Sequence, residues 1–419
     1  MRLHPPMVLA NWPLVPAKYV FKEVYRPPRA EDSIVTAFRD GEVTLRKNRR
    51  TTGFTNAIAE IGYHGIRIGD LVIHSMDGFA GAIGVSDSVG KASPVVHAYL
   101  SRGTDHRFYA HLLRAYAWSG YIESLSKGIR QRSTAFDQAT FGALRLPLPV
   151  IETQTRIADF LDRETGRLDA LMDKKRRLIE LLEEKRTALI SHAVEGSSAD
   201  PTVKLGRFVD LLPGYAFPSS GFIHDGEGST GIRLLRGVNV APGTVRWDEM
   251  VRWLKTESGA FLQFQLKPGD LVLGMDRPWI GSGIRVARVT EQDVPSLLLQ
   301  RVARLRSREG LDQDYLFMLL AGNQFLAYFE PILTGISVPH ISPEQIMNFR
   351  FRLPTRRTQR RVVELVDRQT SVILSLIQRI DEQISKLGEY RQALITGAVT
   401  GQIDVSTFDA DRMVEEVAG

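Results

Sequence analysis

Arg186-Thr-Ala-Leu-Ile-Ser-His-Ala-Val-Glu-Gly196 is followed, 205 residues later, by Arg391-Gln-Ala-Leu-Ile-Thr-Gly-Ala-Val-Thr-Gly401. The same offset joins further matches upstream: Leu148-Pro149, Gln154, Arg156, Asp162-Arg163 and Thr165 recur as Leu353-Pro354, Gln359, Arg361, Asp367-Arg368 and Thr370. The register holds without a gap over almost 50 residues. Chance does not explain a match of this length, so the sequence contains an internal duplication.

Each repeated segment predicts a long helix, because its apolar residues recur at steps of three and four, as in a coiled coil. This seam runs over 157–189 in the first copy and 362–394 in the second. A proline precedes each helix and a glycine follows it, which are the expected start and stop signals. The seam is interrupted by polar residues that would fix the register between the helices: Glu164, Lys175, Gln369 and Gln383. An ordinary amphipathic helix on a globular core is the alternative, and an unbroken length of about 38 residues argues against it.

The segments in front of the two helices have diverged further than the helices themselves. Residues 1–150 and 200–352 each have the length of a full domain. Both contain Gly-Asp-Leu-Val, at 69–72 and 269–272, followed by a glycine-rich turn and a helical stretch. We therefore predict two mixed α/β domains of one ancestry. A constant helical frame with two divergent domains suits a protein whose domains recognise different things.

The composition favours a water-soluble protein with a polyanionic partner. Among 419 residues, 24% are charged and the formal net charge is +6, and a basic surplus favours nucleic acid. Arginine outnumbers lysine by 42 to 12; its fork suits guanine edges and phosphates, although a GC-rich genome would also raise the arginine content. No apolar run approaches the roughly 20 residues that span a membrane, and the N-terminus lacks a continuous apolar signal region. With no cysteines, these features predict a cytoplasmic protein.

The order of the parts resembles the specificity subunit of type I restriction-modification systems: a variable domain, then a Leu-Pro…Gln…Arg helix, twice over. Several stretches carry the likeness: Asp40-Gly-Glu-Val43, Gly69-Asp-Leu-Val72, Gly81-Ala-Ile-Gly-Val-Ser86, Leu234-Leu-Arg-Gly-Val-Asn239 and Gly335-Ile-Ser-Val-Pro-His-Ile-Ser342. Family members commonly have Glu-Gln at the helix entrance. Here the residues are Thr153-Gln154 and Thr358-Gln359, with only the glutamine kept.

The resemblance implies a non-catalytic DNA-reading subunit with an α+β fold. Two target recognition domains would be separated by two long antiparallel coiled-coil helices, related by a pseudo-two-fold repeat. The expected ranges are 1–150 and 200–354 for the domains, 151–199 and 355–404 for the helices, and 405–419 for a tail. The implied partners are double-stranded DNA, two methyltransferase subunits and restriction/translocase subunits, acting in DNA methylation and phage defence. Such a reader would recognise two short words around an unread gap.

Motifs for catalysis or metal binding are not evident in the sequence. Asn11-Trp-Pro-Leu14 lacks the second proline and the aromatic residue of a base methyltransferase. The segment 84–91 resembles a phosphate loop, but it has one residue too many between its glycines, and Ala92 stands where Ser or Thr would hold magnesium. The histidines lack the His-Glu-x-x-His spacing, and thiolate zinc sites need cysteine. We therefore expect no catalytic site, metal or cofactor in this chain, and catalysis in other subunits.

The candidate DNA contacts lie in a basic run, after the Gly-Asp-Leu-Val strands and in the loops before each helix. In the first domain they are Arg46, Lys47, Arg49, Arg50, His74, Ser75, Asp77, Arg130, Arg132 and Ser133. In the second they are Arg277, Trp279, Arg285, Ser337, Val338 and His340. The basic run is alternatively a solvated loop or a phosphate clamp, Trp279 a core residue, and His340 a residue whose hydrogen bond fixes its loop.

Two other functions remain open at this point. A stand-alone DNA-binding regulator would bind DNA tightly without a methyltransferase. A coiled-coil adaptor would bind proteins through both variable domains, and its DNA binding would be absent or independent of salt. The adaptor leaves the paired Gly-Asp-Leu-Val domains without an explanation. The lack of catalytic motifs argues against a third alternative, an enzyme.

Overall fold

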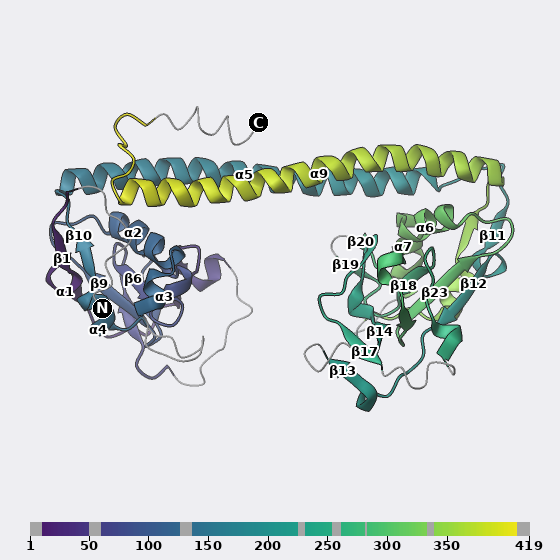
Figure 1. The fold of residues 1–419 in the computed structure, drawn as a ribbon, viewed down its shortest axis with the longest axis horizontal. Helices are drawn as coiled ribbons and strands as arrows, with labels where there is room; N and C mark the ends of the chain where they lie inside the picture. Colours follow the sequence, from purple (N-terminus) through teal and green to yellow (C-terminus); the bar gives the residue numbers. More distant parts are fainter. Residues whose placement is uncertain are drawn as a thin grey trace. The chain divides into compact units, whose positions relative to one another are not determined.

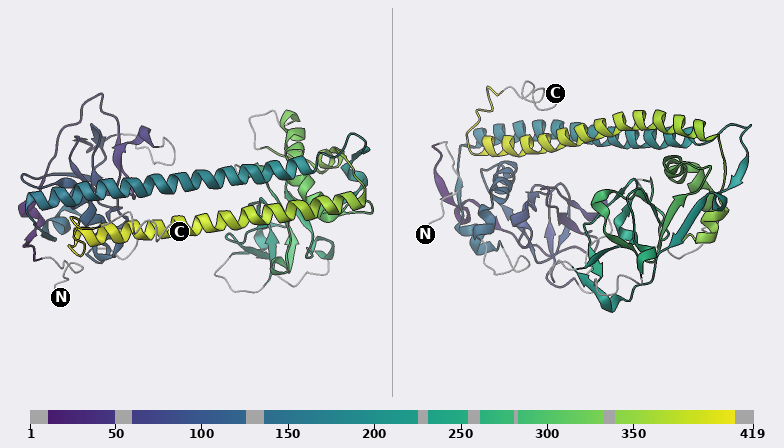
Figure 2. Two further views of the ribbon diagram at one scale, coloured as in Figure 1. Left: turned by 90° about the horizontal axis from the view of Figure 1, so that it is seen from above. Right: turned by 45° about the vertical axis from the view of Figure 1, so that its right-hand side comes forward.

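A computed structural model of the chain describes residues 11–49, 60–125, 136–224, 231–253, 261–280, 283–332 and 339–408. The chain divides into two compact units (Figures 1 and 2). Unit 1 contains Met1–Lys175 and Asp381–Gly419, and unit 2 contains Arg176–Ile380. Each unit therefore combines one globular domain with a part of each long helix, as the predicted α+β fold requires.

The two long helices are α5, Ile151–Ala193, and α9, Arg356–Val399. Within unit 1 they run antiparallel, since Asp169 pairs with Arg391 and Lys175 donates to Gln383 at 2.7 Å. The second contact joins two of the polar seam residues across the helix pair, as predicted. Gly196 and Gly401 lie just beyond the helices with φ of +69° and +73°, a backbone conformation that glycine adopts without strain and that commonly ends helices.

The seam between the helices is buried unevenly. In unit 1, Leu168, Leu387 and Leu394 are buried in the domain core. In unit 2, Val366, Ile373 and Ile380 are buried, but the seam residues Leu178 and Leu376 are 46% and 42% exposed. The three-four spacing therefore predicted the helices correctly but overestimated how tightly their faces close in unit 2.

Unit 1 is built on a four-stranded antiparallel sheet with the order β2-β9-β6-β7. Helix α2, His106–Trp118, covers one face of the sheet and contributes to the core that also contains α5 and α9 (Figure 1). Strand pairs β1–β10, β3–β4 and β5–β8 complete the domain. The bounds are β1 Leu14–Pro16, α1 Ala17–Val20, β2 Lys22–Glu23, β3 Val35–Ala37, β4 Val43–Leu45, β5 His64–Ile66, β6 Leu71–His74, β7 Ile83–Val85, β8 Gly90–Ala92, β9 Val96–Leu100, α3 Tyr121–Leu125, α4 Gln138–Ala143 and β10 Arg145–Pro147.

Unit 2 has a four-stranded antiparallel sheet with the order β12-β23-β18-β21, and helices α6 and α7 contribute to its core. A second sheet, β13-β17-β14-β22, contains a parallel pair, β14–β22. The bounds are β11 Thr202–Lys204, β12 Val209–Pro213, β13 Phe222–His224, β14 Ile232–Leu235, β15 Val240–Ala241, β16 Thr244–Val245, β17 Val251–Trp253, β18 Leu271–Gly274, β19 Trp279–Ile280, β20 Gly283–Ile284, β21 Val286–Arg288, β22 Ser296–Leu298, β23 Val302–Ser307, α6 Gln313–Ala321, α7 Asn323–Phe329, α8 Pro343–Asn348 and β24 Arg350–Arg352.

The duplication extends into the domains. The Gly-Asp-Leu-Val strand is third in its sheet in both units: β6 in the order β2-β9-β6-β7, and β18 in the order β12-β23-β18-β21. His106 at the start of α2 contacts the Gly69 carbonyl at 2.6 Å and accepts from the Ser101 amide. Gln313 at the start of α6 makes the corresponding contacts with Gly269 and Ser307. Equivalent backbone groups, a glycine carbonyl and a serine amide, are thus hydrogen-bonded by an imidazole in unit 1 and by a side-chain amide in unit 2.

A buried glutamine joins each domain to its long helix. Gln154 is 1% exposed; its Oε1 accepts from the Asp105 amide at 2.9 Å, and its Nε2 donates to the Pro149 carbonyl at 2.7 Å. Gln359 accepts from the Asp312 amide and donates to the Pro354 carbonyl at 2.8 and 2.9 Å. Asp105 and Asp312 are the N-caps of α2 and α6. Each glutamine amide therefore holds the start of the domain helix against the start of the long helix.

A buried aspartate shapes the turn before each Gly-Asp-Leu-Val strand. Asp70 and Asp270 are 1% and 4% exposed, and each accepts the backbone amide three residues earlier at 2.8 Å. Asp70 also pairs with Arg26 at 2.6 Å, whereas Asp270 pairs with Arg306. Arg26 lies in the coil after β2, whereas Arg306 lies on β23, so the anion was kept and its partner changed. A buried carboxylate needs such pairing.

Replacing one glutamine should loosen one unit only. In Gln154→Ala, the Asp105 amide and the Pro149 carbonyl lose their partner in the interior, at a cost of about 1–3 kcal/mol for each group. We expect faster amide hydrogen exchange at the first turn of α2, with α6 unchanged. Gln359→Ala should give the reciprocal pattern, and Arg156→Ala, an exposed change two residues away, should alter neither helix. Equal acceleration in both units by either variant would contradict a local joint.

Candidate nucleic-acid interface

A concave pocket in unit 1 gathers most of the described DNA-contact candidates of the first domain. It has a volume of about 750 Å³ and lies beside the β3–β4 hairpin; we call it the hairpin pocket. Its lining residues are Ile34, Val35, Thr36, Ala37, Phe38, Arg39, Asp40, Arg46, Arg49, His74, Asp77, Ser93 and Val96. The structure therefore brings together Arg46, Arg49, His74 and Asp77, and adds Arg39 and Asp40, which sequence reasoning missed.

Two arginines of the hairpin pocket, Arg39 and Arg49, pair with carboxylates. Arg49 pairs with Asp40 at 2.5 Å and Glu42 at 3.2 Å, and its guanidinium carbon lies 4.4 Å from the centroid of the Phe38 ring. Arg39 pairs with Asp77 at 2.8 Å and is 68% exposed. Exposed pairs of this kind contribute little stability. Their charges are therefore available to a competing anion such as a phosphate.

The remaining candidates near the pocket differ in accessibility. Arg46 lies in a short 3-10 turn and donates to Thr36 at 3.3 Å, while Lys47 is exposed. His74 ends β6 and accepts from the Asp77 amide at 3.1 Å, and burial lowers the pKa of its imidazole. Ser75 is buried, and its hydroxyl donates to the Val95 carbonyl at 2.9 Å. Arg50, Arg130, Arg132 and Ser133 lie outside the described residues.

A cluster at the equivalent strand end of unit 2 holds two of the second domain's candidates. His340 contacts Asp276 at 2.6 Å, and Arg301 approaches both, at 3.4 Å from His340 and 3.5 Å from Asp276. Arg277 donates its amide to the Pro339 carbonyl at 2.7 Å. Arg277 and Arg301 have φ of +43° and +70°, a conformation costly for such side chains and often found at ligand sites. Sequence reasoning missed Arg301, because a positive φ at arginine has no local signal.

Arg285 and Trp279 have other surroundings. Arg285 donates to the Val240 carbonyl at 2.9 Å and to the Asp276 carbonyl at 3.2 Å, and burial lowers its pKa. Trp279 is partly buried against the unit 2 core. It also lines a groove of about 610 Å³ with Glu180, Glu183 and Glu184, where a phosphate would be repelled. Ser337 and Val338 lie outside the described residues.

The residues that follow the two candidate segments in the sequence, Phe136 and Ile341, make equivalent backbone contacts in the two units. Phe136, the first described residue after 126–135, donates its amide to the Ser75 carbonyl at 2.8 Å. Ile341, shortly after 333–338, donates to the Met275 carbonyl at 2.9 Å. Ser75 and Met275 directly follow β6 and β18. Phe136 and Ile341, which follow the two candidate segments in the sequence, are thus bound at equivalent strand ends.

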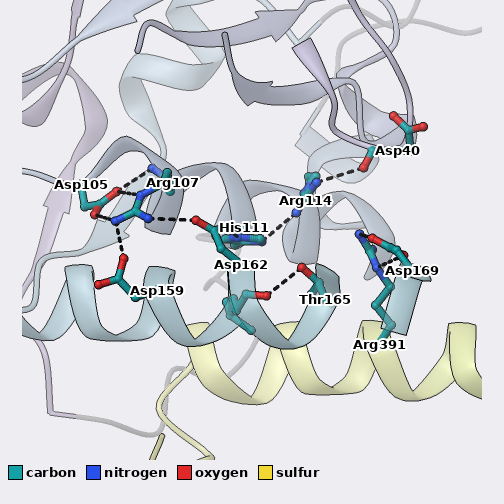
Figure 3. Close-up of polar contacts among 11 residues, drawn as sticks. Asp40, Asp105, Arg107, His111, Arg114, Asp159, Asp162, Thr165, Asp169 and Arg391 are labelled. Carbon is teal, nitrogen blue, oxygen red and sulfur yellow. Dashed lines mark hydrogen bonds and ion pairs between the residues drawn. The ribbon is translucent and has the colours of Figure 1, made fainter. Parts of the chain in front are cut away.

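A polar network, buried only at His111 and Arg114, connects α2 to α5 in unit 1 (Figure 3). Arg107 contacts Asp159 at 2.8 Å and Asp162 at 2.9 Å on α5. His111 contacts Asp162 at 3.2 Å, and Arg114 donates to the other ring nitrogen of His111 at 2.7 Å. Burial lowers the pKa of His111, and the neighbouring Arg114 lowers it further.

A metal-binding cluster and a membrane-spanning helix are both absent from the described ranges. Those residues contain no group of three or more His, Asp or Glu side chains placed to hold a metal ion. None of their helices is long and apolar enough to cross a membrane.

Comparisons with known proteins agree with this architecture. The chain is 26% identical over 290 residues to the type I restriction enzyme MjaVIII specificity subunit of Methanocaldococcus jannaschii, covering 65% of each protein. It is 33% identical over 165 residues to the EcoAI specificity subunit of Escherichia coli, covering 39% of this chain and 27% of that one. The chain is thus similar in sequence to type I restriction enzyme specificity subunits. The matched segments span less than two thirds of either specificity subunit. No family model matches the chain.

A solved structure shares the fold over almost the whole chain. It comes from work on complex assembly and conformational transition of the type I restriction-modification system. The TM-score is 0.68 at 18% identity, covering 95% of this chain and 99% of the other. The likeness to the sequences of specificity subunits is thus accompanied by a likeness in fold.

Unit 1 should lose stability as the pH falls, whereas unit 2 should not by this mechanism. Burial lowers the pKa of His64, His74 and His111, all in unit 1, below the ordinary 6.5. The unfolded chain therefore binds protons more readily, and stability falls as the pH drops from about 6.5 toward the folded-state pKa values. Amide hydrogen exchange between pH 7.5 and 5.5 would measure the effect, and His111→Gln should reduce it. A larger loss in unit 2 would contradict the assignment.

Proposed function

We propose that this chain is the DNA-specificity subunit of a type I restriction-modification complex. It reads a bipartite double-stranded target through recognition domains at 1–150 and 200–354. The helices dock two methyltransferase subunits and, for cleavage, restriction/translocase subunits. The chain supplies recognition, and the chemistry belongs to its partners.

The observation that carries this proposal is that both units share one scaffold but present different side chains at equivalent strand ends. The glutamine joints, the strand order and the backbone contacts of Phe136 and Ile341 are the same in both units. The side chains displayed at the equivalent strand ends are different: His74 and Asp77 in unit 1, and Asp276 and Arg277 in unit 2. One scaffold carrying two sets of polar side chains suits the recognition of two different DNA words, because base contacts specify and the scaffold positions.

The charge of the candidate interface points the same way. Exposed or partly exposed arginines line the hairpin pocket and flank Asp276, as expected for contacts to phosphates and guanine edges. Recognition is therefore the function that these residues support.

Modified-base sequencing of host DNA tests the proposal directly. We expect a methylated motif of two short words around a fixed gap, present with the chain and lost on its deletion. The neighbouring methyltransferase must be active in the same cells, which a plasmid-borne copy of this chain would verify by restoring the motif. A methylome that is unchanged by deletion would favour the regulator or the adaptor instead.

Each single-arginine variant should weaken recognition of only one of the two DNA words. Arg46→Ala should relax or weaken the word read by unit 1, and Arg277→Gly the word read by unit 2, at about 1–3 kcal/mol per lost base contact. Glycine is chosen at 277 because it accepts the positive φ. Arg350→Ala, an exposed change elsewhere in unit 2, is the control. Equal loss of both words by either variant in a folded protein would contradict modular reading.

The length of the unread gap between the two DNA words should depend on the length of the two long helices. Helices α5 and α9 each pass from one unit into the other, at 175/176 and at 380/381. Four extra residues in each helix at these points add about 6 Å, slightly more than one turn. We expect both words to persist while the unread gap grows by about one or two base pairs, since one step is about 3.4 Å. Retained methylation with an unchanged gap would refute the helices as the spacer.

A further inference from the structure

Arg114 on α2 is a buried cation that contacts the turn of the β3–β4 hairpin. Its side chain donates to the Asp40 carbonyl at 2.9 Å and to the His111 ring at 2.7 Å (Figure 3). The residue is only 7% exposed, and its guanidinium carbon lies 5.8 Å from the centroid of the Trp118 ring. Burial lowers the pKa of Arg114 to about 10, and the nearby Arg391 adds to the effect.

The environment of Arg114 is costly for a cation. Among the described residues, its hydrogen bonds go to a backbone carbonyl and an imidazole rather than to a carboxylate, and its Nε has no partner. A buried charge without a direct ion pair is destabilising. A folding role alone would be met better by an apolar side chain, so the contacts that Arg114 makes point to a function.

Helix α5 orients Arg114 through His111. The ring nitrogen of His111 that faces Arg114 accepts a hydrogen bond, so the other nitrogen carries the proton and donates to Asp162 at 3.2 Å. Asp162 is held in turn by Arg107 at 2.9 Å. A continuous set of polar contacts therefore runs from α5 through α2 to the Asp40 carbonyl.

The turn that Arg114 holds forms one wall of the hairpin pocket. Asp40 binds Arg49, and its neighbour Arg39 binds Asp77; all four residues line the pocket. Gly41 has φ of +94°, and a Cβ atom there would overlap the Arg114 guanidinium. Glycine at this position thus makes room for the buried arginine beneath the turn.

We propose that Arg114 is a positioning residue for DNA reading by unit 1: it sets the 38–41 turn, and with it Arg39 and Arg49, from a side chain oriented by α5 through His111 and Asp162. This inference rests on the proposed function. Arg114 touches no DNA itself in this scheme, and its effect is confined to the word read by unit 1.

Unit 2 lacks this arrangement, which provides an internal control. The α6 positions equivalent to His111 and Arg114 are Met318 and Ala321, in register with the His106–Gln313 match. The β15–β16 hairpin of unit 2 is held by Arg285 through the Val240 carbonyl. A change at Arg114 therefore leaves the hairpin of unit 2 untouched.

The test uses the full chain assembled with its methyltransferase subunits. Binding is measured to duplexes that carry the target or a single-base change in one word, with the unit 1 word defined as the one relaxed by Arg46→Ala. In Arg114→Met we expect discrimination in that word to fall about tenfold, the effect of losing a charged hydrogen bond, with the other word unchanged. Arg114→Lys should be intermediate, since one ammonium replaces a two-armed guanidinium. Asp169→Asn, which breaks the neighbouring pair with Arg391, should leave both words intact.

Amide exchange in the same complexes separates positioning from general destabilisation. The Gly41 amide, which donates to the Phe38 carbonyl at 2.9 Å, should exchange faster in Arg114→Met while α2 stays protected. Unchanged reading of the unit 1 word would overturn the inference, and so would equal loss of both words with a lower melting temperature. If the wild-type complex fails to discriminate either word, the proposed function fails first, and the DNA role of the turn fails with it.

Discussion

The buried amides of Gln154 and Gln359 are the contacts on which the duplicated architecture depends. Each satisfies the amide of an N-cap aspartate and the carbonyl of a proline, two groups that the interior would otherwise leave unpaired. A primary amide is suited to this task because it donates and accepts at once. By fixing the start of α2 or α6 on the long helix, it lets the outer parts of each domain change without disturbing the frame.

Features set by local sequence patterns could be predicted, whereas contacts between distant residues could not. The helices, their seam and the duplication follow from local periodicity, so 151–193 and 356–399 were foreseeable in outline. The structural role of the kept glutamine was not, since its partners Asp105 and Asp312 lie 49 and 47 residues away. The exposure of Leu178 and Leu376 was equally hidden, because a heptad pattern shows which residues share a face and not how closely two faces meet.

The candidate interface was predictable in part for the same reason. Arg46 and Arg49 belong to a visible basic run, and His74 and Asp77 follow a recognisable strand, so their nomination needed only local patterns. Their meeting in one pocket, together with Arg39 and Asp40, depends on the pairing of β6 with β9 and on the β3–β4 hairpin. Asp276, Arg301 and His340 converge through tertiary contacts between residues 39 and 64 positions apart. Spacing rules do not reach such distances.

The two hairpins show which property was retained as the domains diverged. Hairpin β3–β4 is held through the Asp40 carbonyl by Arg114 from a helix, and β15–β16 through the Val240 carbonyl by Arg285 from beside a strand. Burial lowers the pKa of both arginines, so each unit bears the cost of a desolvated cation. The two residues are not equivalent by duplication, since α6 has Ala321 in place of Arg114. Both units therefore hold a hairpin carbonyl with a guanidinium, buried at Arg114 and only partly buried at Arg285, from different positions in the chain. Such an arrangement is expected if the placement of the hairpin, rather than any one residue, was under constraint.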